Sequence, residues 1–351
     1  MFNKMADISI AIVTYQNKVE VLSQTVYSVL ATTLDIKLYI IDNSPTDIIG
    51  TFFNDPRIEY IFMSSNNGFG AGHNIIMRNL DKMGKYHLVL NPDIYFGRGV
   101  LEKLYEYMEN NLDVGNVMPK VIYPNGELQY LCKLLPTPQD WIVRMFIPIK
   151  KIKERIDYNL EMHFADYDSE MNVPYLSGCF MFLRKTVIKE IGVFDEGIFM
   201  YGEDIDLSCR ITKSGYKNYY LPYPILHYKG ESTSKESYRY VHVFYGAMDI
   251  FFRKHGSHYP LPYRWMIRTG IKIQTWLKLT IVCVKKCFFA LRPTKEYMPC
   301  FLIFINEKNL GNIRTIFNSN QLNGHHHFVI VDEKSVINEP ELLSSFSDEF
   351  T

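Results

Sequence analysis

The first 95 residues repeat one pattern, a short apolar run followed by a polar turn, and this repetition constrains the fold more than any other feature. The runs occupy residues 8–14, 37–41, 58–63 and 86–90. The first is a continuous β-branched run, as expected of a strand buried on both faces, and apolar residues at helical spacing follow it. Four such units predict an α/β domain built on a doubly wound, mostly parallel sheet.

Polar residues follow each of the predicted strands. In an open parallel sheet, ligands bind just outside the carboxyl ends of the strands. The sequence therefore predicts that four polar segments converge on one binding site: Thr14-Tyr15, Asp42-Asn43-Ser44, Asn66-Asn67 and Asn91-Pro92-Asp93.

Asp93 is the best candidate for a metal ligand at that site. A carboxylate at a strand tip can anchor a hard divalent ion, which offsets the negative charge of a pyrophosphate group. His227 ends a predicted extended segment and is a candidate second ligand. Two alternatives stay open, because Asn91-Pro92-Asp93 can be only a turn and a lone histidine is more often structural.

Three carboxylates, those of Glu203, Asp204 and Asp206, stand at the start of a predicted helix. Helix capping and the helix dipole favour acidic residues there, which accounts for one or two of them. The aromatic, glycine-punctuated segment before them favours a catalytic role as well. Transfer of a group to a hydroxyl needs a base that takes the hydroxyl proton, and a carboxylate is suited to it.

The segment Ser65–Asn74 contains Gly68, Gly70 and Gly72 ahead of a predicted helix. Glycine allows the backbone to approach a ligand closely, and a helix N-terminus attracts phosphate groups and sugar hydroxyls. The spacing resembles a dinucleotide-binding fingerprint only superficially, so by itself it is weak evidence.

Residues 236–292 are expected to form at least two helices. Residues 293–351 are expected to form a small α/β tail without an assigned role, with two strands at 299–306 and 326–332 around a polar helix. The stretch 271–291 contains four lysines, which is too much charge for a membrane-spanning helix. Two interpretations are equally supported. The helix either lies in a membrane interface, with Trp265 and Trp276 as anchors, or packs on the main domain.

Charge and cysteine content exclude other classes. Lys plus Arg and Asp plus Glu number 38 each, so the chain lacks the positive field of a nucleic-acid binder. The six cysteines form neither a CxxC motif nor a zinc pattern, and the first residues do not resemble a secretory signal. A cytoplasmic location is therefore expected, peripheral on the inner face of the cytoplasmic membrane if the C-terminal helix is interfacial.

Seven motifs occur in an order that resembles family 2 glycosyltransferases, and most closely the bacterial rhamnosyltransferase-type branch of cell-surface polysaccharide synthesis. They span residues 8–234 and are IVTYQN, IIDNS, NNGFGAGHN, LNPD, SGCFMFLRK, GVFDEGIFMYGEDIDLSCR and a histidine before KGESTS. The resemblance implies a GT-A fold, Mg²⁺ or Mn²⁺, and inversion at the anomeric carbon. It also implies a nucleotide-sugar donor, dTDP-rhamnose or a UDP-sugar, and a glycan or lipid-linked acceptor.

The resemblance assigns a role to each candidate residue. Asp204 would be the base with Glu203 in support, and Asp93 and His227 would hold the metal ion. Acceptor contacts would come from Asp206 and Gly178. Donor contacts would come from Thr14, Tyr15, Asp42, Asn67, Gly68, Asn74 and Asn91, the last of which replaces the first aspartate of the usual Asp-x-Asp motif.

The resemblance also divides the chain. Residues 1–235 would form the glycosyltransferase domain, with a nucleotide-sugar-binding half at 1–95 and an acceptor and catalytic half at 96–235. C-terminal helices and the small tail would follow.

Two alternatives belong to other classes. A sugar-nucleotide pyrophosphorylase or nucleotidyltransferase would carry a basic, glycine-rich loop after the first strand, where this chain has Tyr15-Gln16-Asn17. A non-catalytic glycan-binding or scaffold protein with a degenerate glycosyltransferase fold would not need Asp93, Asp204 and His227 together. Hydrolysis of a nucleotide sugar by the purified protein would distinguish it from an enzyme.

Overall fold

The computed structural model describes residues 6–135, 149–228 and 237–285 with their side chains, and residues 137, 140, 143 and 147 between them. It also describes the backbone of residues 286–290, 300–305 and 325–330. The chain forms two compact units, Met1–Lys285 and Lys286–Thr351.

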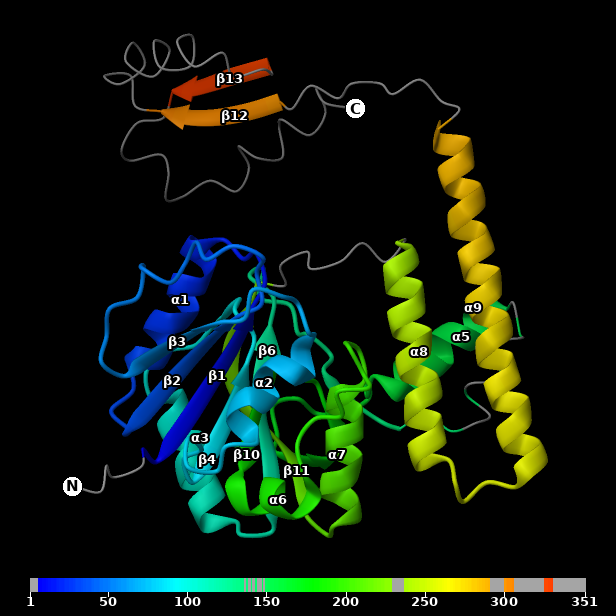
Figure 1. The fold of residues 1–351 in the computed structure, drawn as a ribbon, viewed down its shortest axis with the longest axis horizontal. Helices are drawn as coiled ribbons and strands as arrows, with labels where there is room; N and C mark the ends of the chain where they lie inside the picture. The colour runs from blue at the N-terminus through cyan, green and yellow to red at the C-terminus, as the bar shows by residue number, and fades with distance from the viewer. Residues whose placement is uncertain are drawn as a thin grey trace. The chain divides into compact units, whose positions relative to one another are not determined.

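One large sheet organises the first unit (Figure 1). In its described part, nine strands form this sheet in the order β3-β2-β1-β4-β10-β6-β11-β5, with β8 paired to β11. The strands are β1 Ile8–Thr14, β2 Ile36–Asp42, β3 Ile58–Phe62, β4 Tyr86–Leu90, β5 Ile94–Tyr95, β6 Val114–Ile122, β8 Met171–Val173, β10 Phe180–Arg184 and β11 Lys217–His227. A separate antiparallel pair joins β7 Cys132–Lys133 to β9 Tyr175–Leu176.

The sheet is mostly parallel, as predicted. Strands β1 to β4 run parallel to one another. Strand β10 is antiparallel to both β4 and β6, which makes β6 and its parallel neighbour β11 run the same way as the first four strands. The carboxyl ends of β1 to β4 therefore lie on one edge of the sheet, and the polar segments that follow them share that edge.

Both faces of the sheet are covered by helices, which explains the continuous apolar strands. On one face, Ile8, Ile10 and Ile12 pack in a cluster with α1 Val19–Leu30 and α3 Val100–Asn110. On the other face, Ala11 and Ile41 pack in a cluster with α2 Phe69–Met77, α6 Lys185–Ile191 and α7 Glu203–Lys213. Alternate residues of a strand point to opposite faces, so one run of β-branched residues serves both layers.

Two C-terminal helices follow, α8 Tyr238–His255 and α9 Leu261–Ala290, and a shorter helix, α5 Lys150–Leu160, lies earlier in the chain. Phe252 of α8 packs against Ile267 and Ile271 of α9. Arg268 of α9 forms an ion pair with Asp249 of α8 at 2.7 Å. Within the described ranges, no helix is both long enough and apolar enough to cross a membrane.

In the second unit, β12 Cys300–Ile305 and β13 His325–Ile330 form a parallel pair. Two strands were expected at 299–306 and 326–332, and these agree with them. The polar helix expected between them falls outside the described residues, as does the KGESTS motif after His227.

Candidate active site

The ends of β1 and β2 bring Thr14 and Asp42 side by side, since the two residues are register partners. Both are 1% exposed. The Asp42 carboxylate accepts hydrogen bonds from the Ser44 backbone N–H at 2.9 Å and from the Tyr60 hydroxyl at 2.8 Å. These bonds fix the carboxylate at the strand tip, next to Tyr15, whose ring is 43% exposed.

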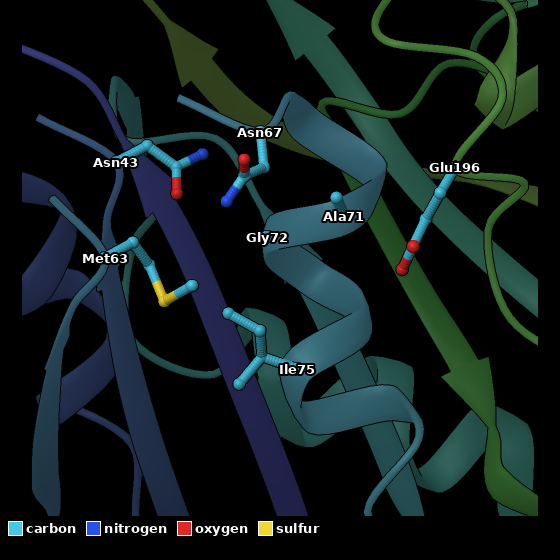
Figure 2. Close-up of a pocket in the computed structure, with 7 residues that line it drawn as sticks. All are labelled: Asn43, Met63, Asn67, Ala71, Gly72, Ile75 and Glu196. Atoms are coloured by element: carbon cyan, nitrogen blue, oxygen red, sulfur yellow. The ribbon is translucent and has the colours of Figure 1, made fainter. Parts of the chain in front are cut away.

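A pocket of about 200 Å³ opens beside this edge, between the ends of β2 and β3 and helix α2. Its lining consists of Asn43, Met63, Asn67, Ala71, Gly72, Ile75 and Glu196 (Figure 2). The amide nitrogen of Asn43 donates to the Gly68 carbonyl at 3.3 Å. Its Oδ1 is buried and has no hydrogen-bond partner among the described residues. A buried carbonyl oxygen in this state calls for an N–H or O–H donor from a ligand or a water molecule.

Gly68 directly precedes α2 and has a conformation that favours glycine, with φ of +97°. A Cβ there would lie 2.5 Å from the backbone oxygen of Phe199, which also accepts the N–H of Phe69. The glycine therefore lets the start of α2 dock against the segment that leads into α7.

Asn74 makes its side-chain hydrogen bonds within the protein, and its predicted contact with the nucleotide-sugar donor is corrected. The side chain is 1% exposed, and its amide nitrogen donates to the Phe194 carbonyl and to Glu196, each at 2.9 Å. Its Oδ1 accepts the N–H of Phe194. Because all of these bonds go to residues 194–196, Asn74 holds that segment against α2.

Asp93 and His227, the two predicted metal ligands, lie next to each other. The imidazole Nε2 of His227 lies 3.2 Å from Oδ1 of Asp93 and 3.4 Å from the Asn91 amide nitrogen. On the far side of the ring, Nδ1 lies 2.9 Å from Oε1 of Gln129, whose amide nitrogen donates to the His227 carbonyl. That second bond turns the Gln129 oxygen toward Nδ1, so Nδ1 carries the hydrogen. The Nε2 atom thus faces Asp93, the arrangement typical of a metal-binding histidine.

Asp204 lies in the first turn of α7, and three donors hold its carboxylate. Oδ2 accepts the Gly178 N–H at 2.8 Å and the Tyr175 hydroxyl at 3.0 Å, and Oδ1 accepts the N–H of Ile205 at 2.8 Å. Burial raises the pKa of the Asp204 carboxyl, although these hydrogen bonds act in the opposite direction. A held carboxylate with a raised pKa is a stronger base than an exposed aspartate.

The turn before α7 explains how two carboxylates are presented together. Tyr201 has φ of +72° and Gly202 has φ of +150°, conformations that side chains other than glycine rarely adopt. Glu203 follows, 5% exposed, with its carboxylate accepting the Gly202 N–H at 2.9 Å. Burial, and next the charge of Asp204, raise the pKa of Glu203. The turn therefore places two buried carboxylates with raised pKa values next to each other at the start of α7.

Cys179 connects the two halves of the site. Its carbonyl accepts the N–H of Asn91 at 2.9 Å, and the residue before it, Gly178, donates to Asp204. Burial, together with the charges of Asp93 and Asp204, raises the pKa of the Cys179 thiol to about 12. The Asp93–His227 pair and the Asp204 carboxylate therefore both lie near Cys179, although they are far apart in the sequence.

Asp206 does not contact an acceptor, and this prediction is also corrected. The residue is fully buried and points from α7 toward α8. Its carboxylate lies 2.7 Å from His255, 2.8 Å from Arg210 and 2.9 Å from Lys254. Arg210, Lys254 and His255 occupy both oxygens, so Asp206 ties α7 to α8.

Gly178, predicted to contact the acceptor, packs against Asp204, the predicted base, and this contact gives a testable expectation. A Cβ at this position would lie 3.1 Å from Cβ and 3.3 Å from Oδ2 of Asp204. Gly178→Ala should displace the carboxylate and lower turnover at least about tenfold, because catalysis is sensitive to shifts well below 1 Å. Gly97→Ala, where a Cβ meets nothing within 4 Å, is the matched control for steady-state kinetics. Unchanged turnover in Gly178→Ala would contradict this role.

The sequence did not single out three residues of the site, namely Asn43, Gln129 and Tyr175. Each acts through a partner distant in the chain: Gln129 lies 98 positions before His227, and Tyr175 lies 29 before Asp204. Asn43 lies within the predicted polar segment Asp42-Asn43-Ser44. The sequence around Gln129 and Tyr175 gave no comparable indication.

A sequence model described as Glycosyl transferase family 2 matches residues 9–192, slightly more than half of the chain. The chain belongs to this family. A second model, Glycosyl transferase family group 2, matches residues 153–306. The protein is therefore a glycosyltransferase, and its mostly parallel sheet with helices on both faces agrees with the expected GT-A fold.

Two relatives place this glycosyltransferase in the rhamnosyltransferase-like branch. The N-acetylglucosaminyl-diphospho-decaprenol L-rhamnosyltransferase of Mycobacterium tuberculosis is 25% identical over 266 residues, which cover 71% of this chain and 85% of the relative. Rhamnosyltransferase WbbL of Escherichia coli K12 is 28% identical over 168 residues, covering 46% of this chain and 61% of the relative.

Among solved structures, the mannosyltransferase PcManGT from Pyrobaculum calidifontis, in complex with GDP-Man and Mn²⁺, is similar with a TM-score of 0.46 and 12% identity. The similarity covers 91% of this chain and 81% of that one.

Proposed function

We propose that this glycosyltransferase moves a sugar from a nucleotide-sugar donor to an acceptor hydroxyl in a single displacement that inverts the anomeric carbon. The observation that carries the proposal is that Asp204 and the Asp93–His227 pair both lie near Cys179. One group can take a proton from the acceptor while the other holds the charge of the leaving diphosphate.

Asp204 is the proposed base. An acceptor hydroxyl is a poor nucleophile until its proton has a place to go, and a positioned carboxylate supplies it. Gly178, Tyr175 and the Ile205 amide hold the carboxylate in one orientation, so no reorganisation is needed during the reaction. Glu203 accepts the Gly202 N–H and so supports the start of the helix.

The residues at the Asp93–His227 pair fit a divalent ion. Two neighbouring ligands about 2.1 Å from an octahedral ion lie about 3 Å apart, and Asp93 Oδ1 and His227 Nε2 lie 3.2 Å apart. Among the described residues, no group of three or more His, Cys, Asp or Glu side chains is placed to hold a metal ion together, so phosphate oxygens and water would complete the shell. A Mg²⁺ or Mn²⁺ ion bound there would neutralise charge on the departing diphosphate.

The donor nucleoside is assigned to the edge formed by Thr14, Tyr15 and Asp42, next to the pocket with the unpartnered Asn43 oxygen. By analogy with the two rhamnosyltransferase relatives, the donor would be dTDP-rhamnose, with a UDP-sugar as the alternative. The Mycobacterium tuberculosis relative is named for a lipid-linked saccharide acceptor, and a similar cell-surface precursor at the inner face of the cytoplasmic membrane is the proposed acceptor here.

Donor binding is expected to depend on a divalent ion. In calorimetry with UDP or dTDP, replacing Mn²⁺ by EDTA should weaken binding at least about tenfold, because Asp93 would then repel the diphosphate. Asp93→Asn and His227→Ala should bind less Mn²⁺ and lose most of this dependence.

Asp168→Asn is the control for that experiment, since this aspartate is 85% exposed and pairs with Lys120. Equal nucleotide affinity with Mn²⁺ and with EDTA would rule out the metal site. A protein that binds glycans but hydrolyses no nucleotide sugar would instead be the non-catalytic scaffold.

A further inference from the structure

One face of helix α9 packs against helix α8. Ile267 and Ile271 are 1% and 2% exposed and pack against Phe252 of α8. The ion pair between Arg268 and Asp249, at 2.7 Å, fixes the rotation of the helix on this contact. The opposite face of α9 is therefore presented outward in a defined way.

That outward face is apolar. Its exposed side chains include Trp265, Met266, Ile273, Trp276, Leu277 and Ile281, of which the two tryptophans are 75% and 65% exposed. At 3.6 residues per turn these positions fall within an arc of about 160°. No charged residue between 261 and 285 falls within this arc. We call this set of side chains the α9 apolar face.

The charges of the helix border this face and have a single sign. From Gly256 to Ala290 the sequence contains no Asp or Glu, whereas α9 contains six Lys or Arg residues. Lys272 lies at one edge of the α9 apolar face and Lys285 beyond the other, and both are exposed. An apolar stripe with tryptophans, flanked by positive charge, matches the interface of an anionic bilayer.

We propose that the α9 apolar face is a docking surface for a membrane that contains anionic lipids. The tryptophans and aliphatic side chains enter the boundary between headgroups and acyl chains, and the lysines at the edges remain among the phosphates. A second copy of the chain fits this surface less well, because two such helices would bring many positive charges together without acidic partners on α9.

Vesicle flotation of the full chain tests the proposal without donor or acceptor. The protein should float with vesicles of phosphatidylcholine and phosphatidylglycerol at low salt, and much less with phosphatidylcholine alone. Two of the three tryptophans are in the α9 apolar face, so tryptophan emission should shift to shorter wavelength on binding. Trp276→Glu or Ile273→Glu should lower partitioning at least about tenfold. Lys272→Gln should lower it about fivefold, and on the anionic vesicles alone.

Tyr27→Glu on α1 is the matched control, because Tyr27 is 68% exposed on another helix. It should float like the wild type. Wild-type flotation of Trp276→Glu would overturn the proposal. A second result would also overturn it: the wild type does not float with vesicles, and light scattering shows a wild-type dimer that the Trp276→Glu substitution dissociates. Hydrolysis of nucleotide sugar in solution should be unchanged in Trp276→Glu, so failure of this proposal and failure of the proposed function give different results.

Discussion

Asp204→Asn is expected to lower turnover by about 10²–10⁴-fold, a rise of roughly 3–5 kcal/mol in the barrier. The amide keeps the size of the side chain and can still accept the Gly178 N–H, but it cannot take a proton. Donor affinity, measured by calorimetry with Mn²⁺, should stay within about twofold of the wild type. Glu203→Gln should cost much less. Near-wild-type turnover of Asp204→Asn, or a product that retains the anomeric configuration, would exclude this mechanism.

The pH profile provides a second check on the same residue. The base acts when deprotonated, and burial raises its pKa, so kcat/KM should fall with decreasing pH earlier than for an exposed aspartate. The Tyr175 hydroxyl bond lowers that pKa. Tyr175→Phe should therefore move the acidic limb to higher pH, whereas a purely structural role for Tyr175 would leave the limb in place.

Asp206→Asn should destabilise the protein by about 3 kcal/mol, because it removes the common partner of Arg210, Lys254 and His255 from a buried site. For a unit of this size, that corresponds to a fall in Tm of roughly 5 °C. Differential scanning calorimetry measures it. Asp195→Asn is the matched control, since Asp195 shares Lys254 at 3.0 Å but is 30% exposed, and it should cost less than about 1 kcal/mol.

Acid should have a related effect on the same cluster. Burial raises the pKa of Asp206, but His255, Arg210 and Lys254 outweigh it and lower the pKa to about 2. A carboxyl whose pKa is lowered on folding stabilises the protein at pH values above its pKa in the unfolded state, which is near 4. This stabilisation is lost as the pH falls toward the folded-state pKa of about 2. The contribution is roughly 2 kcal/mol. In Asp206→Asn, the free energy of unfolding should vary less with pH over this range.

The sequence predicted the parallel half of the sheet well. Strands 8–14 and 86–90 agree with β1 and β4 to the residue, because buried strands are continuous apolar runs that polar turns interrupt. The antiparallel insertion of β10 between β4 and β6 was not foreseen. Local composition describes a strand but not its neighbour, and the choice of neighbour depends on the packing of the whole domain.

For the site, too, the sequence predicted the residues whose positions depend on local structure, but not those whose roles depend on the packing of distant segments. Asp93, His227 and Asp204 lie where their strand ends and helix start place them, and the sequence could single them out. Asn74 was predicted to contact the donor and Asp206 the acceptor, because both are polar and lie in family motifs. In the structure, each side chain instead forms buried bonds to a segment distant in the sequence. A motif records that a residue is needed but does not distinguish contact with a substrate from support of the backbone.

The Asp206 cluster also decides where this protein can be cut. The boundary expected at residue 235 separates Asp206 from Lys254 and His255, and uncovers Gly202, whose Cβ position lies 3.6 Å from Ala247. A fragment that ends there would leave Asp206 with Arg210 alone and would expose to solvent a carboxylate that α8 now covers. Expression of the enzymatic part by itself should therefore extend at least through His255, so that the end of α8 remains attached to the helix that it stabilises.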